Sequence, residues 1–150
     1  MLNKDADGKT GEPFIMEIER GKIYEFAEAT QTHHPGYMSP DSPIIPPTFL
    51  TSQFFWEERI KASNPWHLVE MSQKRGMHAE QEYIFHGPPP KAGTRLYCQS
   101  RIENMHEKKG RSGGTLHFAS LVTEFRDASG KLVAEAKMTG VETEKPPEAN

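Results

Sequence analysis

The hydrophobic pattern is most pronounced over residues 44–62, where apolar and aromatic side chains recur at helical spacing on one broad face. Pro46 and Pro47 are typical of a helix entry, because proline lacks the N–H group that a first turn leaves without an intrahelical acceptor. Polar residues and Pro65 end the pattern. We therefore expect a long helix here. Its many aromatic side chains favour burial on more than one side, which a sheet curled around the helix provides.

Two shorter elements precede this stretch and are separated from it by a loop. Apolar residues predict a short strand at residues 14–18, and apolar positions that share one face predict a helix at residues 20–30. Residues 31–43 are rich in proline and other turn residues, so they predict a loop. A strand and a helix are therefore expected before the central helix begins.

Four strands are predicted after the central stretch, at residues 80–86, 94–104, 114–126 and 131–143. The second strand alternates clearly, and one of its faces consists of Leu96, Cys98, Ser100 and Ile102. Turn residues between successive strands, including a charged hairpin loop at residues 106–113, favour antiparallel pairing in a meander. The chain is therefore expected to form an α+β domain with one long helix laid across a curled antiparallel sheet.

Composition and charge narrow the classes of function. The 150 residues have the size of one domain, which we place at residues 13–143 between flexible polar tails at residues 1–12 and 144–150. A net charge of −3 gives no electrostatic basis for binding a nucleic acid or a membrane surface. The single cysteine, Cys98, forms no internal disulfide and is expected to be a buried thiol, which fits a reducing cytoplasm. No signal peptide or membrane-spanning segment is recognised, so a soluble cytoplasmic protein is expected.

Four segments agree in order and spacing with one known family: residues 22–30 with the following His34 and Pro35, residues 44–49, residues 83–88 and residues 130–134. Together they resemble the MaoC-like dehydratases and hydratases. The resemblance is to the dehydratase region of fatty-acid synthases and to the small paired subunits of mycobacterial hydroxyacyl-carrier-protein dehydratases. It implies a single hot-dog fold, an antiparallel sheet curled around a long central helix. No cofactor is expected.

The resemblance also implies a chemistry. In active members, an Asp and a His activate the water that adds to a trans-2-enoyl thioester to give a (3R)-hydroxyacyl thioester, or catalyse the reverse reaction. A backbone N–H group at the start of the central helix polarises the thioester carbonyl. The Asp and His lie in a stretch like Gly-Asp-x-Asn-Pro-x-His after the first helix, and the central helix opens with His-Gly.

This chain departs from the family at those positions. Aligned on Pro35, it has Thr32 in place of the Asp and Tyr37 in place of the His, and Pro46 and Pro47 replace His-Gly. Threonine is not a base near neutral pH, tyrosine titrates near pH 10, and proline has no N–H group. The resemblance therefore implies a non-catalytic subunit that supports the sheet of a partner and shapes the acyl channel. Its expected ligand is an acyl-CoA or acyl-carrier-protein thioester, and its expected partner is a homologous catalytic subunit or a second copy.

The residues expected to contact the substrate belong to the central helix: Thr48, Phe49, Phe55 and Trp56. Two other functions stay open. His33 and His34 are rival acid–base residues of a self-sufficient hydratase or thioesterase, although a local structural role in the loop is the plainer interpretation. A non-enzymatic acyl-CoA-binding module is the third hypothesis. No metal site is expected, because two adjacent histidines are a poor spacing for one ion and the other histidines are dispersed.

Overall fold

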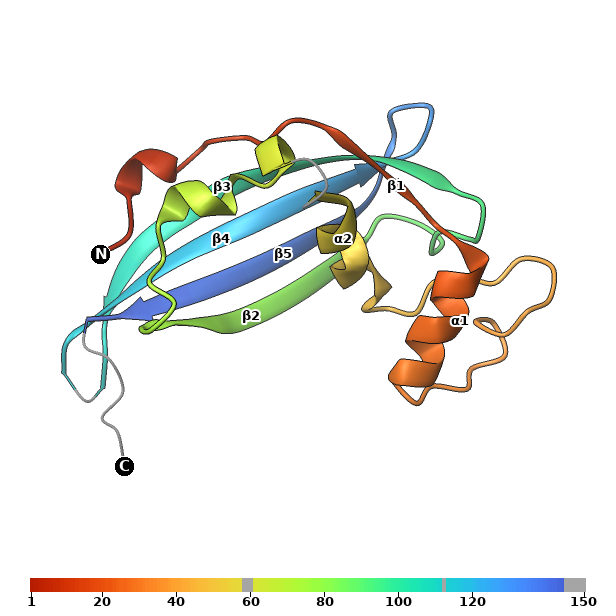
Figure 1. Ribbon diagram of the computed structural model, residues 1–150, viewed down its shortest axis with the longest axis horizontal. Coiled ribbons are helices and arrows are strands. Elements are labelled where there is room, and N and C mark those ends of the chain that lie inside the picture. Colours follow the sequence, from red (N-terminus) through yellow and green to blue (C-terminus); the bar gives the residue numbers. More distant parts are fainter. Residues whose placement is uncertain (58–60, 112, 145–150) are drawn as a thin grey trace.

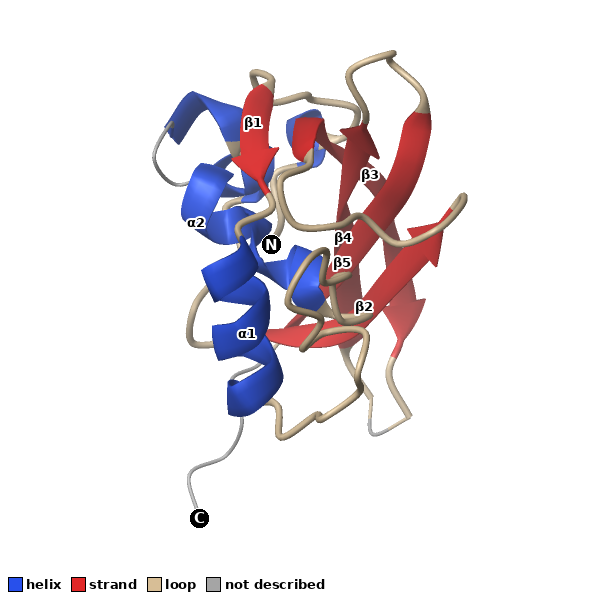
Figure 2. Cartoon of the chain, turned by 90° about the vertical axis from the view of Figure 1, so that its right-hand side faces the viewer, coloured by secondary structure: helices blue, strands red, loops and turns tan. Residues whose placement is uncertain are grey.

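The computed structural model describes residues 1–57, 61–111 and 113–144. Within them, the regular elements in chain order are β1 (Phe14–Glu17), α1 (Arg20–Ala29), α2 (Phe54–Glu57), β2 (Gly76–Phe85), β3 (Arg95–Lys109), β4 (Thr115–Arg126) and β5 (Leu132–Thr143). The strands form a single antiparallel sheet in the order β1-β3-β4-β5-β2 (Figure 1). The helices lie on one face of this sheet (Figure 2). The α+β architecture with a helix-covered antiparallel sheet is confirmed. None of the helices in the described part of the chain is both long and apolar enough to span a membrane.

The predicted inner face of β3 is confirmed. Its buried positions alternate with more exposed ones and consist of Leu96, Cys98, Ser100 and Ile102. Beyond them, Asn104 has a φ of 57° and the pairing with β4 shifts register between Glu103 and His106, which marks a β-bulge. The strand continues past the bulge to Lys109, so the hairpin loop predicted at residues 106–113 is wrong in its first part. A bulge changes the phase of the side-chain alternation, so the period-two pattern in the sequence ends at the bulge although the strand continues.

The predicted meander is wrong for β2. This strand pairs with β5 along its length, not with its sequence neighbour β3. The proline-rich segment at residues 87–94 is therefore a crossover between two strands that do not pair, not a hairpin turn. Three successive prolines have no N–H groups to contribute to a ladder, and they suit a connection that runs outside the sheet.

The central stretch contains less α-helix than expected. Residues Phe49–Gln53 form a 3₁₀ helix, and α2 follows for a single turn. The Phe49 N–H group donates to the Pro46 carbonyl at 3.0 Å, and the Ser52 hydroxyl donates to the Phe49 carbonyl at 2.8 Å. The hydroxyl thus competes for the carbonyl that an α-helix would pair with the amide four residues on, which favours the tighter helix. Residues 58–60 of the predicted helix lie outside the described residues.

The first residues pack against the sheet instead of forming the expected tail. The exposed fractions of Leu2 and Ala6 are only 6% and 0%. The Gly8 N–H group donates to the Ile102 carbonyl at 2.9 Å, and the Ile102 N–H group donates to the Lys9 carbonyl at 2.8 Å. The polar composition of this segment does not predict its packing, because the backbone of the segment, not its side chains, forms the hydrogen bonds with β3. At the other end, residues 145–150 of the predicted tail lie outside the described residues.

Buried apolar side chains form two clusters on the helix-covered face of the sheet. The first cluster consists of Phe14, Met16, Ile18, Ile23, Ile45, Phe49, Leu50, Leu96, Cys98, Phe125, Ala134 and Ala136. The second cluster consists of Leu2, Ala6, Val69, Ile102, Ala119 and Leu121. The first cluster lies under α1 and the 3₁₀ helix, and the second lies under the N-terminal segment and the short 3₁₀ helix Pro65–Val69.

Candidate functional site

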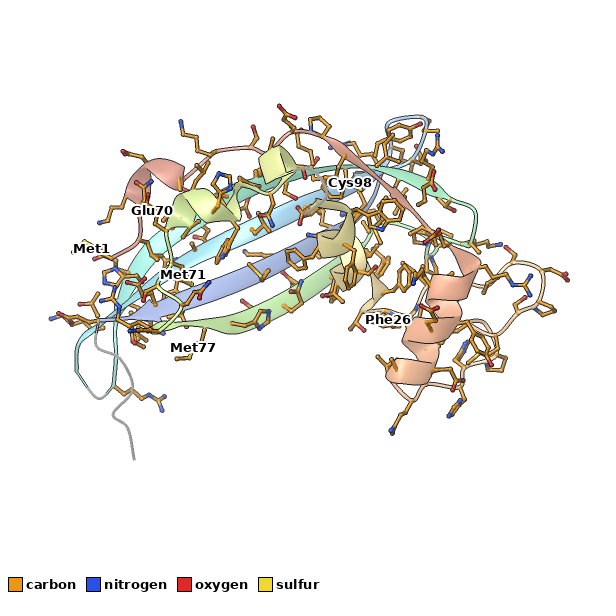
Figure 3. The ribbon with its side chains drawn as sticks, in the orientation of Figure 1. Met1, Phe26, Glu70, Met71, Met77 and Cys98 are labelled. Carbon is orange, nitrogen blue, oxygen red and sulfur yellow. The ribbon has the colours of Figure 1, made fainter. Side chains whose placement is uncertain are left out.

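A groove of about 430 Å³ opens between α1 and the segment formed by the 3₁₀ helix and α2. Its apolar walls are Phe26, Phe49, Phe55 and Trp56, and Ser52 lies between them. Figure 3 shows Phe26 on the side of α1 that faces α2. Its rim has Glu17, Glu19, Lys22 and Glu25. An apolar hollow with a few polar groups at its mouth is the usual form of a small-molecule site.

The aromatic walls differ in burial. The Phe26 and Phe49 rings meet edge to face with their centroids 5.4 Å apart, and Phe49 is only 2% exposed. Phe55 is 76% exposed, an unusual state for so large an apolar side chain. Phe49 therefore forms a fixed inner wall that is part of the first cluster, while Phe55 offers an apolar surface at the mouth.

The charges at the rim are largely paired. Arg95 contacts Glu17 at 2.6 Å, and Lys22 contacts Glu25 at 2.9 Å. The hydrogen bond from Lys22 to Glu25 and the attraction between their charges raise the pKa of the lysine. Three carboxylates against one lysine make the lining residues of the rim acidic on balance. The apolar walls, not the rim, are therefore the part of this groove suited to hold a ligand.

The structure brings together three of the four predicted substrate-contacting residues. Phe49, Phe55 and Trp56 line the groove, whereas Thr48 is exposed ahead of the 3₁₀ helix and is not among the lining residues. The Phe49 N–H group is occupied by the Pro46 carbonyl. In this conformation it is not available to polarise a thioester carbonyl.

Thr32 and Tyr37, the two residues that the resemblance aligns with the family's acid–base pair, lie elsewhere. The Thr32 N–H group donates to the Ala27 carbonyl at 2.9 Å, which places this residue directly after α1. Tyr37 is half-buried and packs against the first cluster. It lines a separate hollow of about 550 Å³ on another flank of α1, with Glu25 between the two hollows. Thr32 and Tyr37 therefore do not line the aromatic groove.

The rival histidines are both exposed. The Nδ1 atom of His34 accepts a hydrogen bond from the Gly36 N–H group at 3.0 Å, and its ring lies 5.0 Å from the Tyr37 ring. These contacts fit the local structural role in the loop. Neither His33 nor His34 is among the residues that line the groove.

Sequence reasoning missed a buried polar network beneath the groove wall. Gln53, Glu57, Ser100 and Thr123 are all 3% exposed or less. The Ser100 hydroxyl donates to Glu57 Oε1, the Ser100 and Thr123 hydroxyls are 2.8 Å apart, and Gln53 Nε2 donates to Thr123 Oγ1 at 2.8 Å. The available signal was Ser100, a polar residue on an otherwise apolar strand face.

Two further chemical expectations bear on the site. Cys98 is buried, as predicted, and burial raises the pKa of its thiol to about 12, so it stays protonated at neutral pH and is a poor nucleophile. Among the described residues, no three His, Cys, Asp or Glu side chains lie close enough together to hold a metal ion.

Comparison with known proteins identifies the family. The model of the "FAS1-like, dehydratase domain region" family matches residues 7–136. A UPF0336 protein of Streptomyces griseus is 28% identical over 144 residues, which cover 90% of this chain and 91% of that protein. A UPF0336 protein of Saccharopolyspora erythraea is 29% identical over 131 residues and is covered to 79%.

Solved structures of the same fold include two complexes from Mycobacterium tuberculosis. The C-terminally truncated HadBC complex, a 3R-hydroxyacyl-ACP dehydratase, has a TM-score of 0.69 at 22% identity, with 93% of this chain and 99% of that chain covered. The ChsH1-ChsH2 complex has a TM-score of 0.67 at 14% identity, with 93% and 86% covered. The (R)-hydratase of A. caviae involved in PHA biosynthesis has a TM-score of 0.60 at 15% identity, with 89% and 94% covered. The predicted hot-dog fold is thereby confirmed, and the chain belongs to the FAS1-like dehydratase domain region family.

Proposed function

We propose that this chain is the non-catalytic subunit of an (R)-specific enoyl-thioester hydratase or 3-hydroxyacyl-thioester dehydratase. It would pair with a homologous subunit that has the Asp and the His. The observation that carries the proposal is the replacement of three chemical groups at once. Thr32 and Tyr37 occupy the positions of the acid–base pair, and Pro47 occupies the position of the glycine that would supply an N–H group.

Two of the structural neighbours support a paired arrangement, because HadBC and ChsH1-ChsH2 are each complexes of two named subunits. A fold shared with such proteins suits a chain that keeps the scaffold and lacks the reacting groups. A homologous subunit is therefore the partner we propose.

The aromatic groove is the part of this chain that would bind the acyl portion of the thioester. Its walls are apolar, and burying each methylene group of an acyl chain is favourable by about 0.8 kcal/mol. Phe55 contributes because its ring is largely exposed without a ligand. The acidic rim gives no attraction for the phosphates of coenzyme A, so in this proposal the partner subunit holds the carrier end.

Hydration of crotonyl-CoA tests the proposal directly. The chain is purified alone and, separately, together with a homologous MaoC-like subunit that has the Asp and His, and the mass in solution is measured on the same samples. We expect no turnover by the lone chain and turnover by the pair. Turnover by the lone chain at ordinary enzyme rates would contradict the support role, and a double substitution His33→Ala/His34→Ala would then show whether these histidines supply the chemistry.

The groove is tested by a charge placed in its mouth. Phe55→Asp removes the exposed aromatic surface and should weaken acyl-CoA binding by the chain or by the pair about tenfold or more, because burying a phenylalanine side chain against a ligand is worth about 1.5–3 kcal/mol. Ile15→Asp is the matched control, since Ile15 is also exposed and apolar but lies on β1 outside the groove. Equal effects of the two substitutions would exclude this groove as the acyl site.

A further inference from the structure

The buried polar network crosses the core as a belt. We use the name polar belt for Gln53, Glu57, Ser100 and Thr123. Ser100 on β3 pairs directly with Thr123 on β4, and the other two residues reach down from the 3₁₀ helix and α2. The belt is thus built from three separate parts of the chain that meet between helix and sheet.

The hydrogen bonds of the polar belt run in one direction when Glu57 is ionised. A carboxylate only accepts, so the Ser100 hydroxyl donates its single proton to Glu57. The Thr123 hydroxyl must then donate to Ser100, and the Gln53 amide donates to Thr123. Each hydroxyl both donates and accepts. An apolar group that inserts into the belt therefore breaks at least one buried hydrogen bond and cannot replace it.

The polar belt separates the two apolar clusters. On β3, Cys98 belongs to the first cluster and Ile102 to the second, with Ser100 between them. On β4, Phe125 belongs to the first cluster and Leu121 to the second, with Thr123 between them. In Figure 3, Cys98 marks the side of the first cluster and Met71 the side of the second, against which it packs. The apolar interior is therefore divided in two.

The inner wall of the groove and part of the polar belt lie on the same segment of the chain. Phe49, Gln53 and Glu57 follow each other at intervals of four residues, and all three are buried. None of the four belt residues lines the groove itself, so an acyl chain reaches the belt only where it extends past Phe49 into the first cluster, to which Phe49 belongs. On the side of the second cluster lies a further hollow of about 240 Å³, lined in part by Trp66, Met71 and Met138, which pack against that cluster.

We propose that the polar belt ends the acyl site and so sets the length of acyl chain that the protein binds. This inference rests on the proposed function, in which the groove holds the acyl portion of a thioester. Methylene groups that lie against the first cluster gain affinity, whereas those that reach the belt must displace hydrogen bonds that nothing in an acyl chain replaces. The preferred ligand is thus a thioester whose acyl chain ends at the belt and does not enter the methionine-lined hollow.

A series of saturated acyl-CoAs from four to sixteen carbons, titrated by calorimetry into the chain or its complex with the catalytic subunit, tests the proposal. Affinity should rise about fourfold per added methylene and then reach a plateau. The variant Gln53→Met/Glu57→Met/Ser100→Ala/Thr123→Val replaces the belt by apolar side chains of similar size. It should move the plateau to longer chains.

The control is a buried hydroxyl pair on the other face of the sheet. Ser120 and Thr139 are hydrogen-bonded at 3.0 Å between β4 and β5. Ser120→Ala/Thr139→Val makes the same kind of change there and should leave the plateau in place. If the variant with four substitutions does not fold, Thr123→Val alone tests whether the belt sets the plateau. It should shift the plateau by one or two methylenes.

The outcomes separate this inference from the proposed function. A plateau that stays at the same chain length in the belt variant, or an affinity that rises without a plateau in the natural chain, overturns the inference alone. If no acyl-CoA of any length binds, the acyl role of the groove fails and the inference fails with it. A plateau that moves in the belt variant and not in the control supports it.

Discussion

The loop at residues 31–37 and the segment at residues 49–57 are held in place by different means. The loop is stabilised by short-range contacts, such as those of His34 with Gly36 and Tyr37, and much of it faces solvent. The segment is anchored from beneath by Phe49 in the first cluster and by Gln53 in the polar belt. Thr32 and Tyr37, which the resemblance aligns with the family's acid–base pair, fall on the loop, and three walls of the groove, Phe49, Phe55 and Trp56, fall on the segment. The buried contacts described here therefore fix the wall of the groove and not the loop.

The sharpest test of this contrast lies within the segment itself. Phe49→Ala should lower the free energy of unfolding by about 3–5 kcal/mol, because a fully buried ring is removed and a cavity remains. Phe55→Ala is the matched control, since the same side chain is deleted from a 76% exposed position and should change stability by no more than about 0.5 kcal/mol. Urea unfolding measures both. Comparable losses would show that burial does not distinguish the two positions.

The polar belt should tolerate change less than an equally buried neutral hydroxyl pair. Ser100→Ala removes the donor to a buried carboxylate and should cost about 1.5–3 kcal/mol. Ser120→Ala breaks a bond between two hydroxyls and should cost about 0.5–1.5 kcal/mol. Thermal or urea unfolding of the two variants makes the comparison. A smaller loss for Ser100→Ala would mean that Glu57 gains little from this contact.

A carboxylate outside both regions shows how partners compensate for burial. Burial opposes the ionised form of Glu142, but the Met1 amino group, the Ser72 N–H group and Arg75 outweigh it, so its pKa is lowered from the usual 4.5. A lowered folded-state pKa gives stability that is present above 4.5 and is lost as pH falls through the folded-state value.

Glu142→Gln should therefore lower the free energy of unfolding at pH 7. The difference in this free energy between the variant and the natural chain should shrink as the pH falls below 4.5. Urea unfolding at pH values from 7 to 3 measures this gap. A gap that stays constant over this range would show that the ionised state of Glu142 contributes nothing to folding.

The smallest effect is expected in the loop. His33→Ala and His34→Ala should each change the free energy of unfolding by no more than about 0.5 kcal/mol, because both side chains are exposed and the hydrogen bond of His34 with Gly36 stays within the loop. Thermal unfolding suffices to measure it. A loss of more than 1 kcal/mol from either substitution would mean that the loop is held by contacts beyond its own turn.

The strands and helix α1 follow from local patterns, and the belt does not. The alternation of β3 identifies its buried face because side chains in a strand point to opposite sides in turn. No local pattern marks Gln53 and Glu57 as buried, because their partners Thr123 and Ser100 lie far away in the sequence. The bulge at Asn104 and the crossover before β3 could not be predicted from the sequence for the same reason, since both depend on which strands become neighbours.

The same strand order has a consequence for how the protein is made. Among the strands of the described residues, β2 pairs with β5 alone, so its ladder cannot be completed on the ribosome until the chain has been synthesised through Glu142. Until then β2 has its hydrogen-bonding groups available to other strands, and any nascent chain that stalls in β4 presents an extended segment open to misassembly. Pairing between strands so far apart in the sequence also slows folding, because the entropy of closing the intervening loop is lost before the stabilising contacts form. Synthesis of β5 is therefore the step that must come before β2 can take its place in the sheet.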